Sequence, residues 1–161
     1  MTATLTSTGS TAAVIVTHQR AELLRASLEQ VVHQTHPVQW VVVVDNGAED
    51  AVRELVESMA GDRGVYVPSE TNLGGAGGFA LGFLTALSLG ADAVWCADDD
   101  GRPADHTVLA ELYRVAEGNR LHEVSPAVCN IDDPGRLAFP LRQGLVWRRR
   151  MDELEGDFLP G

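Results

Sequence analysis

The sequence has few basic residues and few cysteines. Twelve basic residues stand against 23 acidic ones, which gives a formal net charge of -11 at pH 7. This balance argues against nucleic acid as a partner, because phosphate backbones attract cationic surfaces. The two cysteines, Cys96 and Cys129, have apolar neighbours and no CxxC or Cys/His spacing. We therefore interpret them as small buried thiols in a reducing compartment.

Long apolar runs are also missing. None approaches the ~20 residues that a membrane span requires. Residues 1–11 are rich in Thr and Ser and lack the basic and apolar regions of a signal peptide, so we expect a disordered tail. The length of 161 residues, 45% of them hydrophobic, fits one globular domain, which we expect to be cytoplasmic.

Several common site motifs are absent. The turn after the first expected strand reads Thr17-His18-Gln19-Arg20, which is not the glycine fingerprint of dinucleotide-binding proteins. There is no Gly-Lys-Ser/Thr ending of a P-loop and no Gly-x-Ser-x-Gly elbow. The five histidines have no metal-like spacing, and only His18 falls near an expected crevice.

Strand-like apolar runs alternate with amphipathic helical segments along most of the chain. The pattern predicts strands at 12–17, 40–44, 65–67, 93–97 and 123–129, and helices at 21–34, 52–59, 79–87 and 105–117. In the third helix, Phe79, Phe83, Leu84 and Leu87 are expected to face the core. This order predicts an α/β fold with a doubly wound, mainly parallel sheet and helices on both faces. The domain spans 12–130, and an irregular hairpin with a basic, charged tail follows at 131–161.

The segment 93–101 joins a strand-like run to three consecutive carboxylates and a glycine. We expect this strand to be buried on both faces. On extended backbone Asp98 and Asp100 face one way and Asp99 the other. A hard cation such as Mg²⁺ or Mn²⁺ takes one or two carboxylates and completes its shell with phosphate oxygens and water. The alternative is a solvated acidic turn.

Two other strand ends carry polar groups, Thr17 and Asp45-Asn46. The carboxyl ends of parallel strands meet at one crevice, so these groups are expected near the aspartates. Asp45 suits a ribose hydroxyl or a base edge, or else it caps a helix or forms an Asx turn. For Thr17 the alternative is a hydroxyl without a ligand.

Two further segments each have two interpretations. The glycine-rich stretch 72–78 could hold a phosphate at a helix N-terminus, or its glycines could serve tight turning and close helix packing. The run Arg148-Arg149-Arg150 could be a solvated basic face, or it could be attracted to a pyrophosphate or an anionic membrane surface.

Taken together, these motifs resemble the inverting family-two glycosyltransferases with a GT-A fold. The segments that carry the resemblance are 14–18, 43–46, 72–79 and 97–101. The stretches 123–134 and 136–150 make the chain similar to the galactofuranosyltransferases that initiate cell-wall galactan in actinobacteria.

The resemblance implies UDP-galactofuranose as donor, Mn²⁺ or Mg²⁺ as cofactor, and a rhamnosyl-N-acetylglucosaminyl polyprenyl-pyrophosphate acceptor. The acceptor would place the protein peripherally on the inner face of the plasma membrane. It further implies roles for individual residues: Thr17 and Asp45 at the uridine, Asn72, Gly74 and Gly75 along the donor site, Asp98 at the ribose or sugar, Asp100 with Asp98 at the metal, and Asp99 at the sugar or in the turn.

Family members continue well beyond this length, and the general base is expected after Gly161. The chain thus resembles the donor-binding half of the enzyme, which we expect to lack transfer activity by itself. An apolar face left without the second half would favour a homo-oligomer. The alternative function is a metal-dependent nucleotide- or phosphate-binding module without transfer chemistry.

Overall fold

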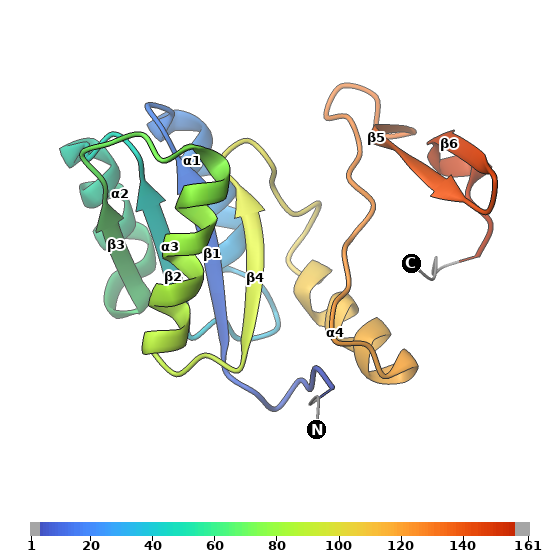
Figure 1. The fold of residues 1–161 in the computed structure, drawn as a ribbon, viewed down its shortest axis with the longest axis horizontal. Helices are drawn as coiled ribbons and strands as arrows, with labels where there is room; N and C mark the ends of the chain where they lie inside the picture. The colour runs from blue at the N-terminus through green and yellow to red at the C-terminus, as the bar shows by residue number, and fades with distance from the viewer. Residues whose placement is uncertain (1–3, 157–161) are drawn as a thin grey trace. The chain divides into compact units, whose positions relative to one another are not determined.

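The computed structural model describes residues 4–156. They divide into two compact units at the boundary between His122 and Glu123. The first unit holds a sheet with its helices, and the second holds a small hairpin (Figure 1).

A four-stranded parallel sheet forms the centre of the first unit. Its strands are β1 (Thr11–Thr17), β2 (Trp40–Asp45), β3 (Gly64–Pro68) and β4 (Ala93–Asp98), in the order β3-β2-β1-β4. The two central strands are valine-rich and buried almost throughout, as expected for strands covered on both faces. Their register places Thr17 opposite Asp45 and Val16 opposite Asp98, so three strand ends meet at one edge.

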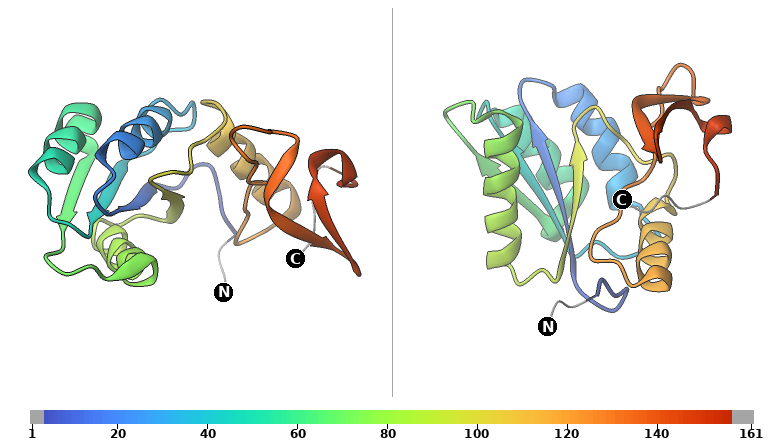
Figure 2. Two further views of the ribbon diagram at one scale, coloured as in Figure 1. Left: turned by 90° about the horizontal axis from the view of Figure 1, so that it is seen from above. Right: turned by 45° about the vertical axis from the view of Figure 1, so that its right-hand side comes forward.

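Helices cover both faces of this sheet (Figures 1 and 2). One face packs against α1 (Ala21–Val32), α2 (Asp50–Ala60) and α4 (Val108–Asn119), and the other packs against α3 (Gly74–Ser88). A short 3₁₀ turn, η1 (Gly61–Arg63), joins α2 to β3. The predicted doubly wound α/β fold is confirmed.

The predicted core face of α3 is confirmed for Phe79, which packs against the core, and is wrong for Phe83, Leu84 and Leu87, which are exposed. Gly78, Gly82 and Ala86 are its buried residues, whereas Leu84 and Leu87 are 66% and 65% exposed. A Cβ on Gly78 would lie 2.5 Å from Val16, and one on Gly82 would also collide with a valine of β1. Small residues thus let the helix backbone approach the sheet closely, with Phe79 and Leu81 packed at the sides of this contact and Leu84 and Leu87 left exposed.

β4 is not buried on both faces, because it lies at the edge of the sheet. The strand expected at 123–129 does not form beside it; within residues 4–156 that segment contributes only an isolated bridge between Cys129 and Leu137. As a result Cys96 is exposed and Cys129 half-buried, contrary to the expectation of two buried thiols.

The residues before β1 also differ from the prediction of a disordered tail. The Leu5 N–H donates to the Leu121 carbonyl, and the Ser10 N–H donates to Asp92. Thr11 is buried and belongs to β1. Residues 4–10 therefore belong to the ordered first unit, and residues 1–3, for which the tail was also predicted, lie outside the described range.

The second unit contains the predicted hairpin. β5 (Arg136–Gln143) pairs antiparallel with β6 (Val146–Arg150), and a 3₁₀ turn, η2 (Met151–Glu153), follows. The pairing shifts register between Arg136 and Leu141, and Gly144 turns with a positive φ of 61°. Across residues 4–156, we find no helix with the length and apolar character needed to cross a membrane.

Candidate functional site

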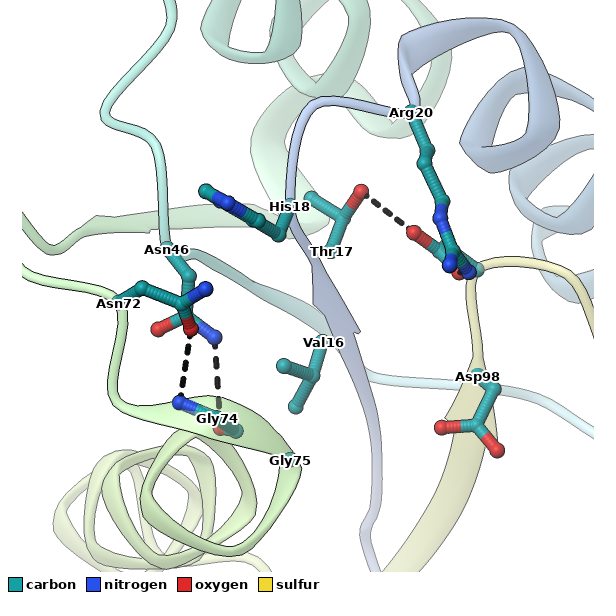
Figure 3. A pocket seen from close by; sticks show the side chains of 10 residues that line it. Val16, Thr17, His18, Arg20, Asn46, Asn72, Gly74, Gly75 and Asp98 are labelled. Carbon is teal, nitrogen blue, oxygen red and sulfur yellow. Dashed lines mark hydrogen bonds and ion pairs between the residues drawn. The ribbon is translucent and has the colours of Figure 1, made fainter.

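A pocket of about 280 Å³ opens at the carboxyl ends of β1 and β4, beside the first turn of α3 (Figure 3). Its lining residues are Val16, Thr17, His18, Arg20, Asn46, Asn72, Gly74, Gly75, Asp98 and Asp99. The structure thus brings together six of the eight predicted site residues. The two others, Asp45 and Asp100, are not among the lining residues.

The end of β4 is fastened to the end of β1 through Asp99. The buried carboxylate of Asp99 accepts a hydrogen bond from the Thr17 hydroxyl at 2.9 Å. The Arg20 guanidinium donates to Asp99 at 3.3 Å and to Asp100 at 3.2 Å. Hydrogen bonds to a buried carboxylate are charge-assisted and directional, so these contacts fix the position of Asp99.

Asp98 and Asp100 remain less engaged than Asp99. Asp98 lines the pocket, and burial raises the pKa of its carboxyl group above the ordinary value; the negative charges of Asp100 and Asp99 raise it further. Asp100 is more than half exposed and bonded to Arg20. Three adjacent carboxylates thus have one guanidinium as counter-ion, which leaves an excess of negative charge at the pocket.

This donor set fits a hard divalent cation. Carboxylate oxygens are the ligands that Mg²⁺ and Mn²⁺ prefer, and a cation would offset both the burial and the neighbouring negative charges that raise the pKa of Asp98. Among residues 4–156, no three His, Cys, Asp or Glu side chains are grouped to hold a metal. Mg²⁺ commonly takes only one or two carboxylates beside phosphate oxygens and water, so Asp98 and Asp100 would hold it together with a ligand.

Asp45 is enclosed by its own turn. It is fully buried, and it accepts hydrogen bonds from the Gly47 N–H at 2.9 Å, the Glu49 N–H at 2.6 Å and the Tyr66 hydroxyl at 3.0 Å. Burial, this hydrogen bond and the charge of Asp45 together raise the pKa of Tyr66 to about 12. The Asx-turn alternative therefore describes Asp45 in this structure.

The next residue, Asn46, holds the start of α3. Its side-chain amide donates to the Gly74 carbonyl at 3.3 Å and accepts from the Leu73 N–H at 3.3 Å. Asn72 accepts from the Gly74 N–H at 2.8 Å (Figure 3). Gly74 has a φ of +67°, a conformation that favours glycine, so this turn requires that residue.

The two interpretations of the glycine-rich stretch, phosphate binding and close helix packing, apply to different glycines. Gly78 and Gly82 allow close packing against β1, because a Cβ at either position would collide with a valine of that strand. Gly74 and Gly75 line the pocket at the N-terminus of a 15-residue helix, where anions are favoured.

Besides Val16, three polar lining residues were not assigned to the site from the sequence, namely His18, Arg20 and Asn46, although His18 and Asn46 were expected near the crevice. The His18 Nδ1 atom is buried without a hydrogen-bond partner among residues 4–156, and His18 and Asn46 both line the pocket (Figure 3). Their positions directly after β1 and β2 were the available signal, because loops at strand carboxyl ends line the crevice.

The site thus has two unlike sides. β1 and β4 contribute a carboxylate cluster with a single arginine, whereas β2 and α3 contribute amides and a helix N-terminus. An acidic side can bind a divalent cation, and the other side can bind polar or anionic groups. This combination suits a ligand that carries phosphate groups together with a metal ion.

Comparison with known proteins relates the chain to glycosyltransferases. The model of the family described as "Glycosyl transferase family 2" matches residues 12–159. The chain is 56% identical to galactofuranosyltransferase GlfT1 of Mycolicibacterium smegmatis over 98% of its length, which is 54% of that protein. It is also 56% identical to GlfT1 of Mycobacterium tuberculosis over 96% of its length, which is 52% of that protein. The chain spans about half the length of these relatives.

Solved structures show the same fold at low identity. Residues 1–349 of S. aureus TarS in complex with UDP give a TM-score of 0.56 at 20% identity, covering 68% of this chain and 32% of that TarS chain. Mannosyltransferase PcManGT of Pyrobaculum calidifontis, in complex with GDP-Man and Mn²⁺, gives 0.55 at 21% identity, covering 81% and 39%. The matched family model covers nearly the whole of the described chain, and the chain therefore belongs to glycosyl transferase family 2.

Proposed function

We propose that this chain binds UDP-galactofuranose together with Mn²⁺ or Mg²⁺, as the donor-binding part of a galactofuranosyltransferase. The acceptor is a rhamnosyl-N-acetylglucosaminyl polyprenyl pyrophosphate at the inner face of the membrane, in cell-wall galactan synthesis. The observation that carries this proposal is the pocket in which Asp98 faces Gly74 and Gly75, in a chain 56% identical to GlfT1. The nucleotide-sugar class agrees with the UDP and GDP-Man complexes of the two structural neighbours.

In this proposal Asp98 and Asp100 hold the metal. A cation held by these two carboxylates would supply electrophilic stabilisation of the negative charge on the departing diphosphate. Asp99 does not bind the metal, because Thr17 and Arg20 already occupy its two oxygens. Asp99 and Thr17 instead position the flanking carboxylates at the end of β4.

The uridine lies against the amide side of the pocket. His18 lies there, and its unpartnered Nδ1 needs a hydrogen bond that a bound ligand can provide; Asn46, whose amide bonds Gly74 and Leu73, holds the turn that shapes this side. Asp45, which the sequence assigned to the uridine, shapes this side indirectly through the turn that presents Asn46.

The general base is proposed to lie in the part of the relatives that this chain does not cover. Inverting transfer needs a base within hydrogen-bond reach of the acceptor hydroxyl, and a missing base lowers rates by about 10²–10⁴-fold. Loss of the acceptor-binding wall lowers them further through poorer positioning.

Calorimetry and a transfer assay test this proposal. The 161-residue chain should bind UDP in preference to ADP and GDP, and His18→Ala and Asn46→Ala should weaken UDP binding and reduce the preference. With labelled donor and a synthetic lipid acceptor, the chain should form no product while full-length GlfT1 does.

Equal affinities for UDP and ADP would remove the proposed uridine site. Clear product from the isolated chain would show that the base lies within these residues.

A further inference from the structure

The β5–β6 hairpin combines basic charge with exposed apolar side chains. Residues 136–150 contain five arginines and no acidic residue, in a chain whose net charge is -11. At and beside the turn, Leu145 is 91% exposed and Trp147 is 61% exposed. Contiguous exposed apolar groups with a polar rim mark interaction surfaces.

The strand pairing sorts these residues onto two faces. Arg142 lies opposite Trp147, and Leu141 lies opposite Arg148. Side chains directly opposite each other share a face, and faces alternate along a strand. Arg149, two residues after Trp147, therefore shares the face of Trp147, which we call the Trp147 face (Arg142, Trp147 and Arg149).

Two arginines of the opposite face, Arg148 and Arg150, are neutralised within the hairpin unit, whereas Arg136, which lies opposite Arg150, is exposed and forms no ion pair within residues 4–156. Arg148 forms an ion pair with Glu155 at 3.1 Å and is only half-exposed. Arg150 pairs with Asp133 and with Asp152, each at 3.5 Å. Two of the three consecutive arginines are therefore already engaged.

The Trp147 face, in contrast, keeps its charge. Arg142 and Arg149 are exposed, and neither forms an ion pair within residues 4–156. The Arg142 guanidinium donates to the Gly144 carbonyl at 2.9 Å, which holds it against the turn. Two uncompensated cations thus flank an exposed tryptophan, with Leu145 projecting at the turn.

We propose that the Trp147 face and Leu145 dock the protein on an anionic lipid bilayer. Tryptophan is enriched at membrane–water interfaces, aliphatic side chains insert at the acyl boundary, and arginine is attracted to anionic headgroups. The inference deepens the proposed function, on which it rests for the lipid-linked acceptor.

Charge selects the bilayer over other occupants of this face. Two copies meeting through it in a symmetric contact would oppose arginines to arginines. Although the chain is acidic overall, charges act over about 8 Å at physiological ionic strength, so the local sign decides. A nucleic acid would use the arginines and leave Leu145 and Trp147 in water.

Vesicle flotation of the 161-residue protein tests the proposal. Binding should occur to phosphatidylcholine vesicles that contain phosphatidylglycerol and should be weak on phosphatidylcholine alone. Arg149→Gln should lower the partition coefficient about fivefold, and Arg142→Gln with Arg149→Gln about 25-fold, at about fivefold per arginine. Leu145→Ser with Trp147→Ala should lower it at least about tenfold.

Arg148→Gln is the matched control, since it removes the same charge from the opposite face and should change partition less than about twofold. Equal losses for Arg148→Gln and Arg149→Gln, or self-association of the protein in place of vesicle binding, would overturn the proposal. UDP calorimetry on every variant distinguishes the membrane-docking proposal from the proposed donor binding. If the protein binds UDP but does not float with the vesicles, only the docking proposal is refuted.

Discussion

The ends of β2 and β4 both carry carboxylates, and the fold uses them in opposite ways. At β2, both carboxylate oxygens of Asp45 accept hydrogen bonds from its own turn or from Tyr66, and the residue is fully buried. At β4, Asp99 is engaged in the same manner, but Asp98 and Asp100 on either side keep capacity for a ligand. A carboxylate at a strand end therefore indicates a binding site only where a neighbouring residue accepts the hydrogen bonds that hold the turn.

The largest effect is expected at the structural carboxylate. Asp45→Ala leaves two backbone N–H groups and a phenol without their acceptor, which should lower the free energy of unfolding by about 3 kcal/mol. Urea unfolding measures this, with the exposed Asp62→Ala as control. Unchanged stability combined with lost UDP binding would mean that Asp45 is a ligand residue after all.

A smaller loss is expected at Asp99. Asp99→Asn removes the charge that Arg20 and Thr17 engage, and it should cost about 1 kcal/mol, because Arg20 is half exposed and its ion pair is screened. Asp100→Asn, in an exposed position, should cost less than about 0.5 kcal/mol. If the two variants lose the same stability in urea, Asp99 is not the anchor of this turn.

A substitution of Arg20 distinguishes the effect of charge on metal binding at the carboxylates from the effect of their geometry. Arg20→Gln removes the only cation seen against Asp99 and Asp100 within the described residues, so Mn²⁺ should bind several-fold more tightly by electron paramagnetic resonance. Stability should change by less than about 1 kcal/mol. Weaker Mn²⁺ binding would instead show that Arg20 holds the carboxylates in the binding geometry.

The smallest effect concerns pH at the β2 end. The pKa of Tyr66 is raised to about 12 in the folded protein, so the neutral phenol stabilises the fold below pH 10 and this contribution is lost as pH rises through 12. Tyr66→Phe should show a shallower fall in the free energy of unfolding between pH 10 and 12. Parallel pH profiles for the two proteins would contradict this assignment.

The fold followed from the sequence because its signals are local. Valine runs, helical periodicity and strand-end polar residues predict a parallel sheet with one crevice, and the register of β1 with β2 and β4 confirms it. The errors arose where tertiary packing decides which residues are buried and hydrophobic periodicity does not. Gly78 and Gly82 invert the expected face of α3, because close backbone approach outweighs the burial of its leucines.

The site was predicted less completely than the fold. Residue type placed Thr17 and Asp98 correctly at the crevice, but it cannot say which hydrogen bonds a carboxylate already makes. That is why Asp45 was assigned to a ligand and Asn46 was not. For the same reason Arg148, Arg149 and Arg150 looked alike in sequence, while ion pairs distinguish them in the structure.

The most direct test of the division between β2 and β4 is UDP calorimetry with Mn²⁺ and with EDTA. In the wild-type chain Mn²⁺ should strengthen UDP binding at least about tenfold, since charge-assisted contacts to the metal–diphosphate add to the neutral ones. Asp98→Asn with Asp100→Asn should remove that gain, and Asp45→Asn, assayed below its unfolding temperature, should retain it. Equal affinity with Mn²⁺ and EDTA in the wild type, or loss of the gain in folded Asp45→Asn, would contradict the account.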